Sequence, residues 1–158
     1  MTIGFENWFE VTQFYARYTS IVDSCDWDRW PDQFTEDCVY RLQPRENHER
    51  NLPLATLAFT SRAMLLDRVY SIKEALFHDP YYQRHIISSP IVHHATSEEW
   101  HCETNYAVFR TKLSDTTTVF NVGRSFDTIV RNEHGLRFAK RECIYDSEMI
   151  PNSIIYPV

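Results

Sequence analysis

The segment Thr117–Arg131, TTVFNVGRSFDTIVR, decides the fold class of this chain. Its side chains alternate between two faces, with Val119, Asn121, Gly123 and Ser125 on one and Phe120, Val122, Arg124 and Phe126 on the other. A period of two over this length is the pattern of a β-strand. Gly123, in the middle of the strand, predicts a bulge or bend that curves the sheet.

Similar segments flank this strand on both sides. They are Arg84 to His94, Glu103 to Leu113 and Leu136 to Asp146. The turn candidates between the four segments are Thr96–Glu99, Ser114–Asp115 and Asn132–Gly135. Long consecutive strands joined by short turns predict an antiparallel meander.

The chain before the meander is mainly helical. One amphipathic helix ends near Asp23–Ser24, and a second ends before Pro80, because a proline disfavours helical geometry in the residue that precedes it. The first helix carries its apolar face on Phe5, Trp8, Phe9, Thr12, Tyr15, Tyr18 (or Thr19) and Val22, and the second on Leu65, Val69, Ile72 and Leu76. Between them we expect a short helix at 27–34, a strand at 37–42, a loop at 44–53 and a short strand at 54–59.

Helices followed by strands predict an α+β fold, in which the helices pack on one face of a strongly curved, mainly antiparallel sheet. The chain has 158 residues, of which 43% are hydrophobic. This length is typical of one domain, and the apolar content is enough for a core. We therefore expect a single domain over residues 1–158.

Composition excludes several classes of function. The net charge is −6 and the basic residues are scattered, so nucleic acid is not expected as a partner. Three glycines are too few for a glycine-rich phosphate loop. The first ten residues lack a signal-peptide pattern, and no apolar run approaches the roughly 18–20 residues of a membrane span. With four dispersed cysteines, this predicts a cytoplasmic protein with reduced, mostly buried thiols.

No metal, redox or nucleophilic motif is found in the sequence. The seven histidines include neither an i, i+4 pair on a helix nor a His/Cys cluster of metal-binding spacing. The cysteines lack the close spacing of an iron–sulfur site. We expect the acidic pair Asp146 and Glu148 to lie in a solvated turn. Likewise, we expect the basic residues Arg131, Arg137, Lys140 and Arg141 to lie on a solvated strand face.

One pair of residues carries a candidate chemistry. A helix beside a strongly bent sheet makes a cone that can enclose a pocket. We expect Asp23, at the end of the first helix, and His85, early in the first long strand, near its mouth. A carboxylate beside an imidazole forms a general acid/base pair. The alternative is structural, with Asp23 as a helix cap and His85 as a hydrogen-bonded histidine.

Aromatic residues make up 15% of the chain, and amphipathic rings are enriched at protein–protein interfaces. Aromatic and arginine side chains supply much of the binding energy at such interfaces. We therefore predict subunit contacts at Arg41, Tyr81, Tyr82, Arg84, Trp100 and Tyr156. The apolar tail 154–158 (IIYPV) is expected to be buried, either on its own sheet or against another subunit.

Several stretches resemble a known family. FYARYTSIVDS at 14–24, residues 27–40, Asp67–Arg68, YQRH at 82–85 and Asp146–Ser147 are similar to the small (beta) subunit of Rieske-type aromatic-ring-hydroxylating oxygenases. Within that family, RLQPREN at 41–47, DRVYSIKEALFHDPYYQRHI at 67–86 and YDSEMIPNSIIYP at 145–157 most resemble the small subunit of salicylate 5-hydroxylase. The resemblance covers nearly the whole chain.

The resemblance implies a cone-shaped fold like nuclear transport factor 2 and scytalone dehydratase. It also implies an assembly of three large (alpha) and three small subunits, which converts salicylate to gentisate with O2. NADH would supply electrons through a ferredoxin reductase and a ferredoxin. The large subunit would hold the Rieske [2Fe–2S] cluster and the mononuclear non-haem iron, and this chain would carry no catalytic residue, cofactor or metal.

Three hypotheses follow. The first is the non-catalytic subunit of such a hydroxylase, with anthranilate, terephthalate or another substituted benzoate as alternative substrates. The second is a stand-alone dehydratase or isomerase that uses Asp23 and His85. The third is a small-molecule binding module that uses the same pocket without chemistry.

Overall fold

A computed structural model describes residues 3–150 and 153–158. The helical elements are α1 (Phe5–Asp23), the 3-10 turn η1 (Pro31–Gln33), α2 (Arg45–Glu49), α3 (Arg62–Tyr70) and the π-helical turn η2 (Ser71–Ala75). The strands are β1 (Phe34–Pro44), β2 (Leu57–Phe59), β3 (Tyr81–Ile87), β4 (Ile91–Ala95), β5 (Glu99–Lys112), β6 (Thr118–Asn132) and β7 (Gly135–Tyr145).

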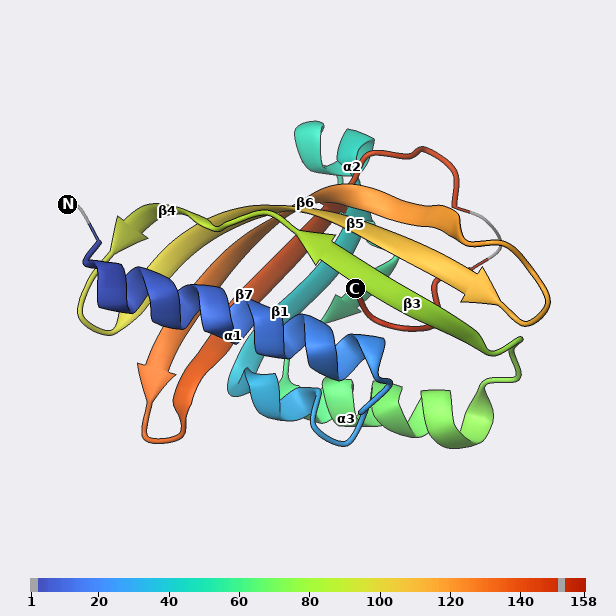
Figure 1. Ribbon diagram of the computed structural model, residues 1–158, viewed down its shortest axis with the longest axis horizontal. Coiled ribbons are helices and arrows are strands. Elements are labelled where there is room, and N and C mark those ends of the chain that lie inside the picture. Colours follow the sequence, from blue (N-terminus) through green and yellow to red (C-terminus); the bar gives the residue numbers. More distant parts are fainter. Residues whose placement is uncertain (1–2, 151–152) are drawn as a thin grey trace.

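The strands form one curved sheet in the order β2-β1-β7-β6-β5-β3, with β4 paired to the start of β5. Figure 1 shows α1 lying across the concave face, with α3 along the open side. The neighbouring pairs are antiparallel except for β1 and β7, which run parallel. The predicted α+β fold with a strongly curved, mainly antiparallel sheet is therefore confirmed.

The buried face of α1 differs from the predicted one. Its core residues are Val11, Phe14, Tyr15, Tyr18, Ile21 and Val22. Phe14 and Tyr18 pack on Phe138 of β7, with ring centroids 4.7 and 5.2 Å away. Phe5 and Phe9, expected inside, are 75% and 50% exposed. In Figure 1 the first turns of α1 extend toward the edge of the sheet, where a side chain has little to pack on.

Three predicted elements also differ. Residues 27–30 form turns, and only Pro31–Gln33 is helical, because a proline in the fifth position of the expected helix has no amide hydrogen to continue it. The predicted loop at 44–53 contains α2, with i, i+4 ion pairs from Arg45 to Glu49 and from Arg50 to Glu46. The segment expected as one strand from Arg84 to His94 is divided, because residues 88–90, which end in Pro90, separate β3 from β4.

Gly123 is required by a close backbone approach. A Cβ atom there would overlap the carbonyl oxygen of Ile144 on β7. The register shifts lie elsewhere, beside Phe109 between β5 and β6 and beside Ile129 between β6 and β7. The shift near Phe109 also changes the alternation, so that Val119 is exposed and Phe120 is buried.

Candidate functional site

Asp23 and His85 are in contact. Asp23 is the last residue of α1, and one of its carboxylate oxygens lies 2.6 Å from Nδ1 of His85 on β3. The main-chain N–H of His85 donates a bifurcated hydrogen bond to the two oxygens of the same carboxylate, at 3.1 and 2.9 Å. Arg84 places a guanidinium nitrogen 3.9 Å away. The carboxylate thus fixes the imidazole ring and ties the end of α1 to β3.

The pair is closed to solvent. The side chain of His85 has 0% exposed surface and that of Asp23 has 6%. Nε2 of His85 is buried and has no hydrogen-bond partner among the described residues. A general acid or base must reach the proton that it transfers. In this state, the geometry is that of a helix-to-strand tie. His85 is the hydrogen-bonded histidine of the structural alternative, but Asp23 bonds to β3 instead of capping α1.

The tail 153–158 fills the interior of the cone. Ile154, Tyr156 and Val158 are buried, and the C-terminal label in Figure 1 lies between α1 and the sheet. The hydroxyls of Tyr18 and Tyr40 donate to the main-chain oxygen of Val158, at 2.9 and 3.1 Å. The sequence predicted that the tail is buried either on its own sheet or against another subunit. The structure shows it buried on its own sheet.

Further hydrogen bonds hold the tail along its length. Arg68 donates to the main-chain oxygens of Ile154 and Ile155, at 3.1 and 2.6 Å. Gln83, two residues before His85 on β3, donates to the oxygen of Pro157 at 3.4 Å. These bonds place the tail in the space that a ligand of a cone-shaped fold would occupy.

A second cluster lies deep under α1. One carboxylate oxygen of Asp127 on β6 accepts from the hydroxyls of Tyr15 and Ser125, both at 2.7 Å, and from Arg141 on β7 at 2.9 Å. Thr104 lies 2.8 Å from Ser125. Burial raises the pKa of Asp127, and the guanidinium of Arg141 opposes that rise. The guanidinium also lies over the Tyr18 ring, with 4.6 Å to the centroid.

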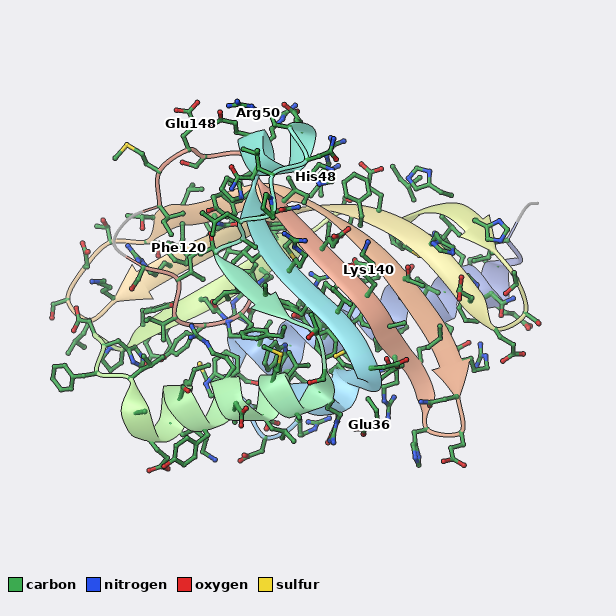
Figure 2. The ribbon with its side chains drawn as sticks, turned by 180° about the vertical axis from the view of Figure 1, so that it is seen from behind. Glu36, His48, Arg50, Phe120, Lys140 and Glu148 are labelled. Atoms are coloured by element: carbon green, nitrogen blue, oxygen red, sulfur yellow. The ribbon has the colours of Figure 1, made fainter. Side chains whose placement is uncertain are left out.

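The placement of Arg141 corrects the sequence prediction, which put it on a solvated face with Arg131, Arg137 and Lys140. It is 1% exposed. The register shift beside Ile129 skips one residue of β7, so that Phe138 and Arg141 both point inward. Lys140 lies on the outer face, where Figure 2 labels it. No pattern in one sequence marks such a shift, so alternation alone could not find this cluster.

The predicted interface residues fall into two groups. Tyr81, Trp100 and Tyr156 were predicted as subunit contacts. Each has less than a tenth of its surface exposed and belongs to the core of this chain. Tyr156 stacks on Tyr81 at 4.4 Å. Tyr82 is 77% exposed, and Arg84 is exposed beside it on the outer face of β3. The sixth residue, Arg41, is partly buried and donates to the oxygen of Pro53 at 2.8 Å.

The thiols do not form a reactive site. Cys38, Cys102 and Cys143 are buried on different strands, and Cys25 is partly buried. Burial raises the pKa of Cys102 and Cys143 to about 12 and that of Cys38 to about 11. A thiol is nucleophilic as the thiolate, so these three are inert at neutral pH.

The described residues contain no group of three or more His, Cys, Asp or Glu side chains placed to hold a metal ion. Within residues 3–150 and 153–158, no helix has the length and apolar character needed to cross a membrane.

Comparison with known proteins points to one family. A family model described as "Ring hydroxylating beta subunit" matches residues 17–152. The small subunit of anthranilate 1,2-dioxygenase from Burkholderia cepacia is 32% identical over 158 residues, which cover 100% of this chain and 98% of the relative. The beta 1 subunit of the terminal oxygenase component of terephthalate 1,2-dioxygenase from Comamonas sp. is 28% identical, with 96% and 99% covered.

Solved structures agree. A chain from Novosphingobium aromaticivorans, assigned as the beta subunit of an aromatic-ring-hydroxylating dioxygenase, matches with a TM-score of 0.87 at 28% identity and covers 96% of this chain and 97% of its own. A chain from the same organism, assigned as a scytalone dehydratase, matches with a TM-score of 0.68 at 15% identity, with 91% and 88% covered. The second match shows likeness of fold alone, and it supports the cone shape.

Proposed function

Residues 17–152 place this chain in the ring-hydroxylating beta-subunit family, and from that membership we propose that it is the structural, non-catalytic small subunit of a Rieske non-haem-iron aromatic-ring hydroxylase. The observation that carries the proposal is the end-to-end similarity to the small subunit of anthranilate 1,2-dioxygenase. The filled interior supports it, because the tail and the aromatic core leave Asp23 and His85 without access to a substrate.

The side chains of this chain do not fit the cofactors of such a hydroxylase. A Rieske cluster takes two cysteines and two histidines. Here the three buried cysteines lie on separate strands, and no metal-binding group forms among the described residues. The proposal therefore assigns the Rieske [2Fe–2S] cluster and the mononuclear iron to the large subunit, and no step of the reaction is routed through this chain.

We propose an assembly of three large and three small subunits in the cytoplasm. In it, NADH, a ferredoxin reductase and a ferredoxin supply electrons for the reaction with O2. Salicylate, converted to gentisate, is the proposed substrate, on the resemblance of residues 41–47, 67–86 and 145–157. The relatives named above act on anthranilate and terephthalate, which are substituted benzoates and form the alternatives.

The test is co-expression of this chain with the large-subunit gene, followed by measurement of mass and iron content. We expect an iron-free chain on its own, and a heterohexamer that contains iron and has oxygenase activity. The complex should turn over salicylate to gentisate faster than it turns over anthranilate or terephthalate. A chain that joins no large subunit and is active by itself would contradict the proposal.

A second candidate function rests on the 2.6 Å contact between Asp23 and His85, and on Nε2 of the imidazole, which has no hydrogen-bond partner among the described residues. On this alternative, the chain is a dehydratase or isomerase whose tail leaves the interior to admit a substrate. Replacing both residues by asparagine decides between the two. Full hydroxylase activity of an intact assembly with the double variant would remove a catalytic role for the pair.

A further inference from the structure

One end of the molecule carries a positively charged hollow. The η2–β3 connection and the β5–β6 turn meet there, on the right of Figure 1. The hollow has a volume of about 180 Å³, and its lining includes His78, Asp79, Tyr81, Arg110, Lys112 and Ile155. It lies outside the interior that the tail fills, and it is separate from the contact between Asp23 and His85.

Arg110 is held in this hollow by aromatic rings. Its guanidinium carbon lies 4.4 Å from the ring centroid of Phe120 and 5.7 Å from that of Tyr81, and both rings are buried. Stacking on rings fixes the plane of a guanidinium while leaving its edge free to donate hydrogen bonds. Among residues 3–150 and 153–158, the Arg110 side chain has neither an ion-pair partner nor a hydrogen-bond acceptor. The arginine is therefore oriented by the rings and keeps its hydrogen-bonding capacity for another molecule.

The surrounding charges favour an anion. Lys112 lies two residues along β5 and pairs with Asp79 at 3.2 Å. The hollow thus has two cationic side chains against one carboxylate, in a chain whose net charge is −6. The planar fork of an arginine matches the two oxygens of a carboxylate. The local charge therefore attracts an acidic group.

Exposed apolar side chains flank the hollow. Phe77 stands fully exposed in the η2–β3 connection, and Leu113 is 90% exposed just after Lys112. Large apolar side chains beside an oriented arginine are the composition of a protein interface. A small carboxylate would occupy the hollow but would leave Phe77 and Leu113 in water. A protein segment with an acidic residue and apolar neighbours would cover all three, so a protein partner fits better.

We propose that Phe77, Arg110, Lys112 and Leu113, which we call the Arg110 surface, receive an acidic side chain of the large subunit. Arg110 pairs with the carboxylate, while Phe77 and Leu113 are buried by the residues around it. This inference rests on the proposed function, because it takes the large subunit as the partner. It adds the place of contact and the chemistry that the partner must present.

The test measures assembly of the co-expressed large subunit with variants of this chain, by titration and mass photometry at low and high salt. Arg110→Gln should weaken assembly by about tenfold or more, the range of arginine hot spots, and should reduce its salt dependence. Arg110→Lys, which keeps the charge and loses the fork, should fall between. Arg17→Gln removes one exposed positive charge from α1 and should stay within about twofold of the wild type.

Two further variants and a ligand-binding measurement distinguish the possible results. Phe77→Ser and Leu113→Ser change fully exposed positions, so they should weaken assembly without unfolding the chain, even if an Arg110 variant folds poorly. Wild-type affinity in the Arg110, Phe77 and Leu113 variants would overturn this inference while leaving the proposed function standing. A wild-type chain that joins no large subunit would remove both. Benzoate binding that depends on Arg110, with normal assembly of Arg110→Gln, would assign the hollow to a free acid and overturn the inference.

Discussion

The interior of the cone and the Arg110 surface differ in whether their charged side chains have partners within this chain. Inside, Arg141 and Asp127 are almost completely buried, and one oxygen of Asp127 accepts three hydrogen bonds from this chain. At the Arg110 surface, the arginine lies against the rings of Phe120 and Tyr81 and has no acceptor among the described residues. The first arrangement stabilises the fold. The second leaves hydrogen-bonding capacity for another molecule.

The largest effect is expected from a substitution that breaks the buried ion pair of Arg141 and Asp127. Arg141→Met leaves the carboxylate of Asp127 buried without its cation, which should lower the free energy of unfolding by about 3–5 kcal/mol in urea titrations. Adding Asp127→Asn removes the stranded charge and should restore a large part of that loss. Lys140→Met, on the outer face next in sequence, should change it by less than about 0.5 kcal/mol. A loss for Arg141→Met as small as that for Lys140→Met would show that the pair is not a stabilising element.

The next effect concerns the tail that closes the interior. Tyr156 is buried against Trp27 and Tyr81, with centroids 5.0 and 4.4 Å away. Tyr156→Ala should cost about 3 kcal/mol of unfolding free energy, the scale of a large aromatic removed from a core. In this size range, 1 kcal/mol corresponds to about 2–4 °C, so the melting temperature should fall by roughly 6–12 °C.

The matched control is Tyr70→Ala, because that tyrosine is 66% exposed on α3 and should lose little. Equal losses at the two tyrosines would contradict a buried tail. A small loss at Tyr156 alone would indicate that the tail leaves the interior easily, which the alternative function of Asp23 and His85 requires.

The Arg110 surface should behave in the opposite way from the interior. Phe77→Ser and Leu113→Ser remove large apolar side chains, yet each should change the unfolding free energy of the isolated chain by less than about 0.5 kcal/mol, because neither side chain is packed. Urea titration of the isolated variants measures this. A loss above about 1 kcal/mol would show that these side chains support the fold, and the contrast between the two regions would fail.

The interior and the surface also differ in how far the sequence predicts them. Periodicity located the long strands and the helix of α3 and η2, where Leu65, Val69 and Ile72 are buried as their spacing indicates. Leu76, expected on the same face, lies beyond the last turn and is 36% exposed. The order of the elements predicts Asp23 and His85 near the mouth of the cone, and the structure shows the two in contact. These features depend on local pattern and on topology.

Other features depend on contacts between distant segments. Arg141 points inward because of a register shift, and a period of two carries no record of such a shift. Tyr18, Tyr40 and Arg68 donate to main-chain oxygens of the tail. Every residue has a main-chain oxygen, so no residue type marks these contacts in the sequence. Other arginines also lie over aromatic rings, but Arg124, Arg131 and Arg141 each have an ion-pair partner, whereas Arg110 has none among the described residues. Neither the Arg141–Asp127 cluster nor the Arg110 surface has a sequence motif, so neither could be predicted before the fold was known.

The last expected effect concerns an ion pair of intermediate exposure on the rim of the sheet. Glu10 on α1 and Arg131 on β6 form a two-pronged ion pair at 2.6 and 2.9 Å, with about a third of each side chain exposed. The hydrogen bond from Arg131 lowers the pKa of Glu10 below its ordinary value. A lowered carboxyl pKa stabilises the fold above the unfolded-state pKa, and the contribution is lost as the pH falls through the folded-state value. Solvent screening limits it to less than about 1 kcal/mol.

Glu10→Gln should therefore melt slightly below the wild type at pH 7, by about 1–3 °C, and the gap should narrow as the pH falls through the lowered pKa of Glu10. Glu6→Gln, one turn earlier on α1 and without an ion pair among the described residues, should follow the wild type at every pH measured. Thermal melts at pH 7, 5 and 3.5 measure the difference. A gap that persists at pH 3.5 would mean that Glu10 acts through packing and not through its charge. Glu10 would then stabilise the fold by packing, as the interior side chains do. Of the regions compared, only the Arg110 surface would present a charged side chain to a partner.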